Sequence, residues 1–596
     1  MKRMINKTLI KLLTAVTVLA LFIAVPIMLN ESDANIQVEQ IDSMAATQDS
    51  ASNIGPRANT GSDPANGIYV STTGNDSTAT GSINKPYKTI KAALEAASKG
   101  STIILRGGTY REGENVRIRT PNITIKSKKN EWAIIDLTKY NPGCNEDSGV
   151  YFDVDSSGGK LKNVEVKGGF YAVCTETRWD WGNPSNRSGA SNIVIEDCKL
   201  HDSRYDVVKI KPNCINITIR YNEIYNSGRA FPGSTSGEDN AEGFDNVNGD
   251  KMLVQNNYIH DIVGNGIYAK GGATDVIIEK NRIERAHGAG IMVGFDTSPE
   301  YFDLKANPNY HENIRGIVRN NLIIDAGWEG IGLYGSKDAL VHNNTMTNAV
   351  AAGNYHSAIY FGLTYQDWED YAGRPPNVNP KIHHNIVCQP STFKLQMIEI
   401  RYADNDHLGL LSALQGKPIM NSNCYYIAGK SAAFTDNRPG GLKNAGLSAW
   451  KSHISGDSGS IEVDPSLNAD YISKNSQCAG MGIQSPLRVT AGTKYAKPKP
   501  TKLTKPSIKK IKANKKKMTV TWNKVSSSQS ISKYQIKYRE KGTKNWKSTT
   551  VKASKSKVVI KNLKKGKQYQ VKIRTYRAST KSYSPWSKVK TSKKIK

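Results

Sequence analysis

A short pattern of β-branched and apolar residues recurs about every 24 residues, and this repeat restricts the possible folds more than any other feature. A period of this length is typical of one coil of a parallel β-helix, in which each coil packs only against its neighbours. Leucine-rich and helical repeats have other periodicities, and the segments here are rich in Ile, Val, Thr and Gly. The spacings that show the period are Ile193 to Ile217 (24 residues), Leu253 to Ile277 (24) and Ile317 to Leu340 (23).

An asparagine follows many of these segments, with an apolar residue close behind it. Asparagine side chains that stack at one turn can hydrogen-bond from coil to coil. We therefore expect a ladder formed by Asn222, Asn257, Asn281, Asn321, Asn344 and Asn385. The whole pattern predicts an all-β protein with a right-handed, single-stranded parallel β-helix over residues 67–493, capped at its start by a helix from Thr89 to Ala97.

The formal charge is distributed very unevenly along the chain. Residues 497–596 hold 30 Lys, 3 Arg and one acid, Glu540, a net charge of +32, whereas the whole chain carries +30. The remainder is close to neutral, so we expect no nucleic-acid partner for it. The basic end is predicted to attach electrostatically to an anionic polymer such as pectin, mucin glycans or cell-wall teichoic acid, with a soluble spacer as the alternative.

The basic end also carries alternating strands that resemble a fibronectin type III domain. The B-strand Trp and the C-strand Tyr of that family match Trp522 and Tyr538, and its Leu-x-x-Gly-x-x-Tyr corner matches residues 563–569. The resemblance implies a β-sandwich over residues 507–596. A Lys/Pro/Thr-rich linker at residues 494–506 is predicted to join it to the β-helix.

The N-terminus has the pattern of a secretory signal. Basic residues precede an apolar run from Leu12 to Leu29, and small residues follow. We predict a signal peptide at residues 1–34, a flexible leader at residues 35–66 and a secreted, monomeric protein with a possible association with the cell surface. An uncleaved membrane anchor is the alternative, and in both cases the folded part is exported.

Acidic and basic residues converge on one face of neighbouring coils. Alternate side chains of a coil point inward, so an alignment of inward residues places the outward ones in ladders. The aligned inward residues are Val208, Phe244, Ile267 and Ile291. The resulting ladders pair Asp206 with Glu242, Lys209 with Asp245, and Lys211 with Lys270. The candidate substrate-binding residues are Asp206, Lys209, Lys211 and Asp245, although a solvated face of ordinary salt bridges has the same pattern.

A second candidate contact with a sugar polymer lies between residues 178 and 181. Aromatic rings stack on sugar faces, and an arginine pairs with carboxylates through two hydrogen bonds. Arg178 and Trp181 are therefore predicted to bind substrate. A loop packed by its own tryptophans is the alternative.

Several segments resemble the β-helical pectate lyases of polysaccharide lyase family 9. The opening of the resemblance is Ile-Tyr-Val-Ser-Thr-Thr-Gly-Asn-Asp (68–76), Lys-Pro-Tyr-Lys-Thr-Ile-Lys-Ala-Ala-Leu (85–94) and Ile-Leu-Arg-Gly-Gly-Thr-Tyr-Arg-Glu (104–112). Glu-Asp-Asn-Ala-Glu-Gly-Phe (238–244) resembles the calcium-binding segment of that family, and Gly-Ile-Tyr-Ala-Lys (266–270) resembles the segment with its catalytic lysine.

The resemblance implies calcium-assisted β-elimination on a uronate-containing polysaccharide, with pectate favoured. It implies that Lys270 is the base and that Ca²⁺ is bound by Glu238, Asp239, Glu242 and Asn226. At positions 238 and 242 this chain has Glu where the family has Asp. A further Asp ligand of the family aligns near Asn226. Calcium also accepts Glu and amide oxygens as ligands. Since a lysine base must lose its proton, an alkaline activity optimum is also implied.

Two other functions fit the same residues. A glycoside hydrolase on this fold would use two carboxylates about 5 to 10 Å apart, for which Asp206 and Glu242 on adjacent coils are candidates. A non-catalytic glycan-binding or adhesive β-helix would use the charged ladder only as a binding face. Calcium dependence and an unsaturated product distinguish the lyase from both.

Overall fold

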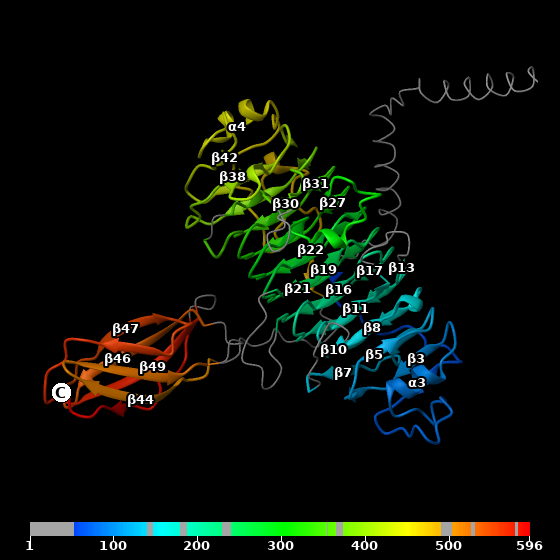
Figure 1. Cartoon of the computed structure of the whole chain (residues 1–596), viewed down its shortest axis with the longest axis horizontal. Helices are drawn as coiled ribbons and strands as arrows, with labels where there is room; N and C mark the ends of the chain where they lie inside the picture. Colours follow the sequence, from blue (N-terminus) through cyan, green and yellow to red (C-terminus); the bar gives the residue numbers. More distant parts are fainter. Residues whose placement is uncertain are drawn as a thin grey trace, which may run out of the picture. The chain divides into compact units, whose positions relative to one another are not determined.

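The computed structural model describes residues 53–139, 147–178, 188–228, 240–353, 356–364, 373–489, 503–525, 531–577 and 582–596. From Ile68 to Asp436 the chain forms coils of three short strands, which stack into three parallel sheets (Figure 1). This architecture is the parallel β-helix that the repeat predicts.

The first sheet contains, in spatial order, β2 (Ile68–Val70), β3 (Thr102–Leu105), β6 (Thr124–Ser127), β9 (Lys160–Lys162), β14 (Val194–Glu196), β17 (Thr218–Arg220), β20 (Leu253–Gln255), β24 (Ile277–Glu279), β28 (Ile317–Arg319), β32 (Leu340–His342), β35 (Lys381–His383) and β40 (Ile419–Asn421). The second contains β4 (Gly108–Tyr110), β7 (Ala133–Leu137), β10 (Val164–Gly168), β15 (Lys199–His201), β18 (Glu223–Tyr225), β21 (Tyr258–His260), β25 (Arg282–Glu284), β29 (Leu322–Ile324), β33 (Thr345–Thr347), β36 (Ile386–Gln389) and β41 (Cys424–Ile427). The third contains β5 (Val116–Ile118), β8 (Val150–Phe152), β11 (Val173–Thr175), β16 (Val208–Ile210), β19 (Phe244–Val247), β22 (Ile267–Lys270), β26 (Ile291–Val293), β30 (Ile331–Tyr334), β34 (Ile359–Gly362), β37 (Ile398–Ile400) and β42 (Phe434–Asp436).

The core of the β-helix consists of the inward side chains of these strands. The predicted alignment is confirmed, because Val208 pairs with Phe244, Phe244 with Ile267, and Ile267 with Ile291 along the third sheet. All four side chains are fully buried. A one-residue shift of any strand would turn its apolar side chains to solvent, so this burial fixes the register of the outward residues as well.

The predicted asparagine ladder is also confirmed, and it extends to Asn423. The Asn321 side-chain oxygen accepts hydrogen bonds from the backbone N–H and the side-chain amide of Asn281, both at 3.0 Å. Asn321 in turn donates its own amide to Asn344 at 3.0 Å and to the Ile278 carbonyl at 2.9 Å. The ladder thus satisfies buried backbone groups where the chain turns between the first and second sheets.

Replacing Asn321 with alanine is expected to destabilise the protein by about 1–3 kcal/mol, because the buried N–H groups of Asn281 lose their acceptor. Chemical denaturation measures this change in the free energy of unfolding. The matched control is Asn309→Ala at an exposed position, for which we expect almost no change. Equal effects of the two substitutions would contradict the role of the ladder.

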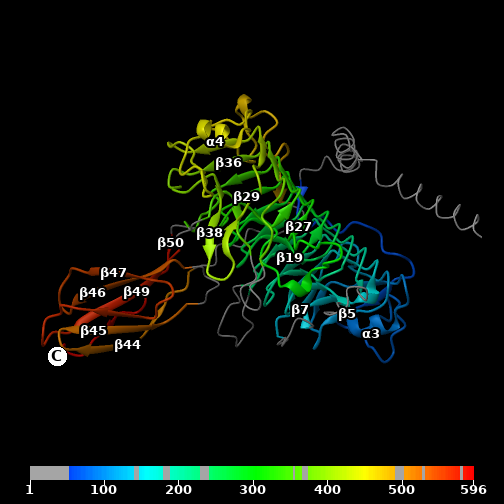
Figure 2. The ribbon, with the colours of Figure 1, turned by 45° about the horizontal axis from the view of Figure 1, so that its top comes forward.

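Helices lie at the two ends of the coil stack, as Figure 2 shows for α3 (Ile90–Ala96) and α4 (Leu447–Ile454). The Thr89 hydroxyl caps α3 by accepting a hydrogen bond from the Ala92 N–H, and the apolar side of α3 covers the first coils. Trp450 of α4 is fully buried and stacks on Phe434 of the last coil. Among the described residues, no helix is long and apolar enough to cross a membrane.

Short elements outside the three sheets are η2 (Val154–Ser156), η3 (Pro299–Tyr301), η4 (Ser476–Cys478), β12 (Thr177–Arg178), β13 (Ser188–Gly189), β23 (Ala273–Thr274), β27 (Asn313–Ile314), β31 (Ser336–Lys337), β38 (Tyr402–Asn405) and β39 (Gly409–Ser412).

Beyond α4 the chain returns along the outside of the second sheet. The Ile483 N–H donates to Thr345 Oγ1 in β33 at 3.0 Å, and Arg282 in β25 donates to the Leu487 carbonyl at 3.3 Å. The segment ends in β43 (Arg488–Val489), which pairs in parallel with β1 (Asn53–Ile54). The return segment therefore covers an outer face of the coils.

The described part of the predicted leader is part of the fold. Ile54 is fully buried in a cluster with Leu322 and Ile483, and the Arg57 guanidinium pairs with Asp197 at 2.8 Å. The prediction of a flexible leader over residues 35–66 is therefore wrong for residues 53–66. A two-residue strand has no detectable periodicity, and its partners lie far along the chain. The preceding leader residues and the predicted signal peptide (1–34) lie outside the described residues.

The basic end is a β-sandwich. One sheet contains β44 (Ser507–Asn514), β45 (Lys517–Asn523) and β48 (Lys557–Ile560), and the other contains β46 (Lys533–Glu540), β47 (Lys547–Lys552), β49 (Tyr569–Arg577), β50 (Ser582–Tyr583) and β51 (Lys590–Thr591). Trp522 and Tyr534 pack between the sheets, with ring centroids 5.2 Å apart. The predicted tyrosine corner is present, since the Tyr569 hydroxyl accepts a hydrogen bond from the Lys564 N–H at 3.0 Å.

Candidate functional site

The acids and lysines that the ladders predict lie on the outer face of the third sheet. Lys209 of β16 pairs with Asp245 of β19, and Val247 of β19 pairs with Lys270 of β22. The Glu242 N–H donates to Asp206 Oδ1 at 2.9 Å, just before these strands begin. The coils therefore bring these side chains together as the sequence predicts.

Asp206, Glu242 and Asp245 form a carboxylate cluster, in which one ligand oxygen from each residue lies within 4.8 Å of the others. Each residue is only 3% exposed. Within the part of the chain that the structure describes, Glu242 Oε2 and Asp245 Oδ1 have no hydrogen-bond partner. Unpaired buried carboxylate oxygens are energetically costly, so the cluster favours a ligand that satisfies them.

The Lys209 ammonium neutralises part of this cluster. Its Nζ lies 3.3 Å from Asp206 Oδ2 and also contacts Asp245 Oδ2. Burial opposes the charge, but the carboxylates of Asp245 and Asp206 raise the pKa of Lys209 well above its usual value. When all three carboxylates are ionised, the cluster and the Lys209 ammonium together carry two negative charges.

Burial, followed by the neighbouring Asp206, raises the pKa of Glu242 well above its usual value. Burial also raises the pKa of Asp206, although the Lys209 charge opposes this. A bound cation would oppose this increase in the pKa of both carboxyl groups, because it favours their ionised forms.

Lys270 ends β22 beside the carboxylate cluster. Its Nζ lies 4.2 Å from the centroid of the Tyr268 ring, and its side chain is partly exposed. Burial raises the pKa of both Glu242 and Glu312, and the nearby Lys270 charge partly opposes the increase in each. Lys270 thus presents an amine between buried acids and solvent.

A buried ion pair holds the backbone next to Lys270. Glu312 Oε2 accepts hydrogen bonds from the Gly271 N–H at 2.9 Å and from the Thr297 hydroxyl at 2.6 Å. The Arg374 Nε lies 3.1 Å from Glu312 Oε1, and both side chains are fully buried. Burial raises the pKa of Glu312 to about 7, although the Arg374 charge opposes this.

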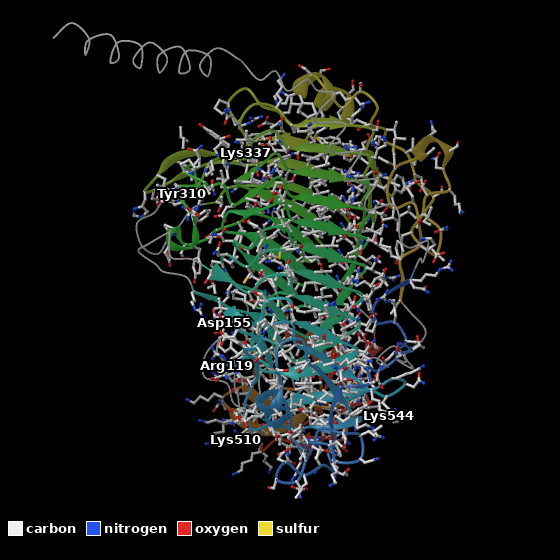
Figure 3. All side chains as sticks on the ribbon, turned by 90° about the vertical axis from the view of Figure 1, so that its right-hand side faces the viewer. Arg119, Asp155, Tyr310, Lys337, Lys510 and Lys544 are labelled. Atoms are coloured by element: carbon white, nitrogen blue, oxygen red, sulfur yellow. The ribbon has the colours of Figure 1, made fainter. Side chains whose placement is uncertain are left out.

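Arg374 also connects two segments that leave the coils. Its guanidinium donates to the Thr297 carbonyl and lies 4.9 Å from the Phe302 ring centroid and 5.1 Å from that of Tyr310. Figure 3 shows Tyr310 on the segment that projects from the stacked strands. The ion pair therefore fixes these segments to the end of the strand that carries Lys270.

Three other predicted site residues that the structure describes have partners outside the carboxylate cluster. Lys211 Nζ pairs with Glu176 at 2.9 Å, and the exposed Arg178 pairs with Asp155 at 2.8 Å. The Asn226 amide donates to Asp202 Oδ1 at 3.1 Å, in a turn with left-handed backbone. Glu238, Asp239 and Trp181 lie outside the described residues.

Two residues predicted to contact substrate, Asp206 and Asp245, are buried, and a third, Lys209, is half-buried. Asp206, Lys209 and Asp245 interact with one another, and the described segments leave little of their surface exposed. The periodicity correctly predicts that they are neighbours, but it contains no information about which outward positions are covered. Asp206 and Asp245 are therefore better placed to contact a cation than a polymer, and Lys209 is their counter-charge.

Sequence reasoning missed Tyr268, Glu312 and Arg374. Tyr268 could have been identified from the sequence, because it lies two residues before Lys270 and aligns with the outward residue Asp245 of the preceding coil. Glu312 and Arg374 meet across 62 residues, in segments without periodicity. No local pattern indicates their contact.

Comparison with known protein families gives two matches. Residues 49–363 match the family described as "Right handed beta helix region". Residues 501–592 match the family described as "Fibronectin type III domain". Both ranges agree with the two parts of the fold.

Individual proteins are similar over limited regions or at low identity. Pectate lyase PEL9 from Emericella nidulans is 32% identical over 120 residues, which cover 18% of this chain and 29% of that relative. The chain thus spans less than a third of the length of this curated relative. The crystal structure of pectate lyase Pel9A is 15% identical over 74% of this chain and 92% of that chain, with a TM-score of 0.39. The FN1–FN3 domains of chicken CNTN1 are 21% identical over 16% of this chain and 31% of that chain, with a TM-score of 0.15.

Proposed function

Because the chain belongs to the right-handed β-helix family, we propose that it is a polysaccharide lyase that cleaves a uronate-containing polymer, with pectate as the favoured substrate. The observation that carries the proposal is a partly exposed lysine, Lys270, beside a buried carboxylate cluster with two unpaired oxygens among the described residues. The local similarity to pectate lyase PEL9 supports the same substrate class.

In the proposed mechanism Lys270 is the general base. It removes the proton at C5 of a uronate, the electron pair of that bond forms the double bond between C4 and C5, and the bond from C4 to the glycosidic oxygen breaks. The leaving oxygen takes up a proton from water, and the new chain end is an unsaturated sugar. The amine must be uncharged to accept this proton, and an unperturbed lysine has a pKa of about 10.4, so the rate is expected to rise toward alkaline pH. Glu312 positions the amine through its hydrogen bond to the Gly271 N–H.

The carboxylate cluster fits a calcium ion. Its donors are the hard oxygens that calcium prefers, and two of them lack a partner among the described residues. The two negative charges that remain beside Lys209 match the charge of the ion. Asp206, Glu242 and Asp245 would hold it, with Glu238 and Asp239 proposed as further ligands. Bound calcium supplies a Lewis acid that neutralises a uronate carboxylate.

The same geometry is less suitable for glycoside hydrolysis. Hydrolases separate their two carboxyl groups by about 5 to 10 Å, to leave room for the sugar and a water molecule. Asp206 and Glu242 lie in a tighter cluster and are buried. This spacing favours a shared cation over an acid and a base that act on opposite sides of a glycosidic bond.

The proposal is tested by following the ultraviolet absorbance of an unsaturated product on a panel of uronate polymers, with calcium or with a chelator. We expect a chelator-sensitive increase on one polymer. New reducing ends without this absorbance would indicate a hydrolase. Tight binding of the folded protein without turnover would indicate an adhesive protein.

We also propose that the protein is secreted and monomeric. The apolar run from Leu12 to Leu29 supports secretion. Recovery of the protein from culture medium, followed by measurement of its molar mass in solution, tests both points. Retention in the membrane fraction would contradict cleavage of the predicted signal peptide.

Replacing Asp245 with asparagine is expected to weaken calcium binding by about 10- to 100-fold, because the cluster loses one of its three charges. Isothermal titration calorimetry of chelator-treated protein measures this affinity. The control is Asp155→Asn, since the Asp155 side chain is 63% exposed and lies outside the cluster. Equal losses in both variants, or no calcium binding by the unaltered protein, would contradict the assignment.

A further inference from the structure

The outer face of one sheet of the fibronectin type III domain carries cations and aromatic rings in alternation. Along β49, Lys572 and Arg574 point outward and alternate with the buried residues Val571, Ile573 and Thr575. The Arg574 guanidinium carbon lies 3.6 Å from the Tyr583 ring centroid and 4.4 Å from that of Trp586. Lys572 Nζ lies 4.9 Å from the Trp586 centroid and 4.4 Å from that of Trp546, and the Arg539 guanidinium carbon lies 4.5 Å from the same Trp546 centroid. We call Arg539, Lys572 and Arg574 the cation row.

The aromatic rings hold the cation row in a fixed arrangement. Contacts with ring faces attract each cation and restrict its rotamers. Two glutamines add to this order, since Arg574 donates to Gln535 at 2.7 Å and Arg539 donates to Gln570 at 2.9 Å. A ligand that binds the row therefore loses little affinity to the ordering of side chains.

The charge of this face is not neutralised by acids of the domain. Glu540 is the single acid between residues 497 and 596, and its carboxylate lies 3.5 Å from the amines of Lys564 and Lys567. Lys537 of β46 lies directly opposite Lys572 of β49, an arrangement in which like charges repel. An anionic ligand would remove this repulsion.

We propose that the cation row is a binding site for a linear polysaccharide that bears carboxylates, a polyuronate. Outward residues of one strand repeat about every 7 Å, which spaces Lys572 and Arg574 along β49. Arg539 lies on the neighbouring strand β46, opposite Gln570, and adds a third charge for an extended polyanion. The forked guanidinium groups of Arg539 and Arg574 match carboxylates in shape as well as in charge. The choice of a polyuronate rests on the proposed function, because a second site for the substrate raises its local concentration for the same chain.

The experiment compares full-length variants for binding to immobilised polygalacturonate at physiological salt. The row variant carries Arg539→Gln, Lys572→Gln and Arg574→Gln. The matched control carries Lys510→Gln, Lys512→Gln and Lys557→Gln at exposed positions of the other sheet, so both lose three charges. We expect the row variant to bind at least about tenfold more weakly and the control to change by less than about threefold. Equal losses would overturn the proposal, because net charge alone would then explain binding.

Three further measurements separate the alternatives. Trp546→Leu keeps the net charge and removes a ring that orders the cation row. We therefore expect this variant to bind polygalacturonate several-fold more weakly. Unchanged binding by the folded variant would also overturn the proposal.

Inorganic polyphosphate and single-stranded DNA are the competing probes, and tighter row-dependent binding of either would assign the face to another polymer. Initial rates on short uronate oligomers test the lyase activity separately. Row-dependent binding without turnover would contradict only the proposed function. Turnover without row-dependent binding would contradict only this inference.

Discussion

Replacing Lys270 with alanine is expected to lower kcat on a uronate polymer by about 10²- to 10⁴-fold, because the proton at C5 loses its general base. The change should leave the fold and the calcium affinity almost unaltered, since Lys270 is partly exposed and the carboxylate cluster keeps its three acids. Rates at saturating substrate, together with calorimetric titration of calcium, measure the two effects independently.

The substitution Lys270→Arg distinguishes a base from a fixed positive charge. An arginine side chain stays protonated in proteins, so it keeps the charge and cannot accept the C5 proton. We expect it to be as inactive as the alanine variant. The matched control is Lys305→Ala, at an exposed position near the same face, which should keep full activity. An active Lys270→Arg protein would contradict the proposed base and leave Lys270 an electrostatic role.

Replacing Arg374 with methionine is expected to destabilise the protein by about 3–5 kcal/mol, because Glu312 becomes a buried carboxylate without its partner. The segments that Arg374 connects should loosen, and activity should fall with stability because the Gly271 backbone beside Lys270 depends on Glu312. Chemical denaturation measures the free energy of unfolding. The double variant Glu312→Gln/Arg374→Met should recover part of the loss, since it removes the buried charge.

The cost of Arg374→Met should depend on pH in a defined direction. Burial raises the pKa of Glu312 to about 7, above its value in the unfolded chain. The neutral form therefore favours the folded state at low pH, and this contribution is lost as pH rises through about 7. Without Arg374 the ionised form is disfavoured further, so the substitution should cost more above pH 7 than below it.

The control for this pair is Arg315→Met, which removes an arginine from the exposed pair with Asp275. Exposed ion pairs contribute only about 0–1 kcal/mol, so a small loss without this pH dependence is expected. If both variants lost the same stability at every pH, the buried pair would not have the role that its geometry indicates.

The fold could be predicted from the sequence because a β-helix repeats its interactions. Each coil contacts only its neighbours, so the spacing of Ile and Val fixes which residues stack, and the alignment of Val208 with Phe244 and Ile267 follows directly. The asparagine ladder was visible for the same reason. In the basic domain, Trp522 and the corner at Tyr569 were identifiable because their spacing is local.

The candidate site could be predicted only in part. The register brought Asp206, Glu242 and Asp245 together, but it did not show that Asp206 and Asp245, which are predicted to contact substrate, are buried. The sequence does not show how exposed an outward residue is. Segments outside the repeat decide whether they cover that residue, and the repeat contains no information about where they pack. The cation row could not be predicted for a similar reason, since Trp546 and Trp586 contact Lys572 from segments far from it in the sequence or outside its strand.

The sequence by itself determined the coil period, the inward and outward residues and the asparagine ladder, because each depends on contacts between residues one coil apart. Only the tertiary structure decided that the carboxylate cluster is buried, that Glu312 meets Arg374 beside Lys270, and that Ile54 packs against the return segment. These contacts join segments without a repeat and far apart in the chain. Their geometry follows from the packing of the whole β-helix, which no local pattern of residues contains.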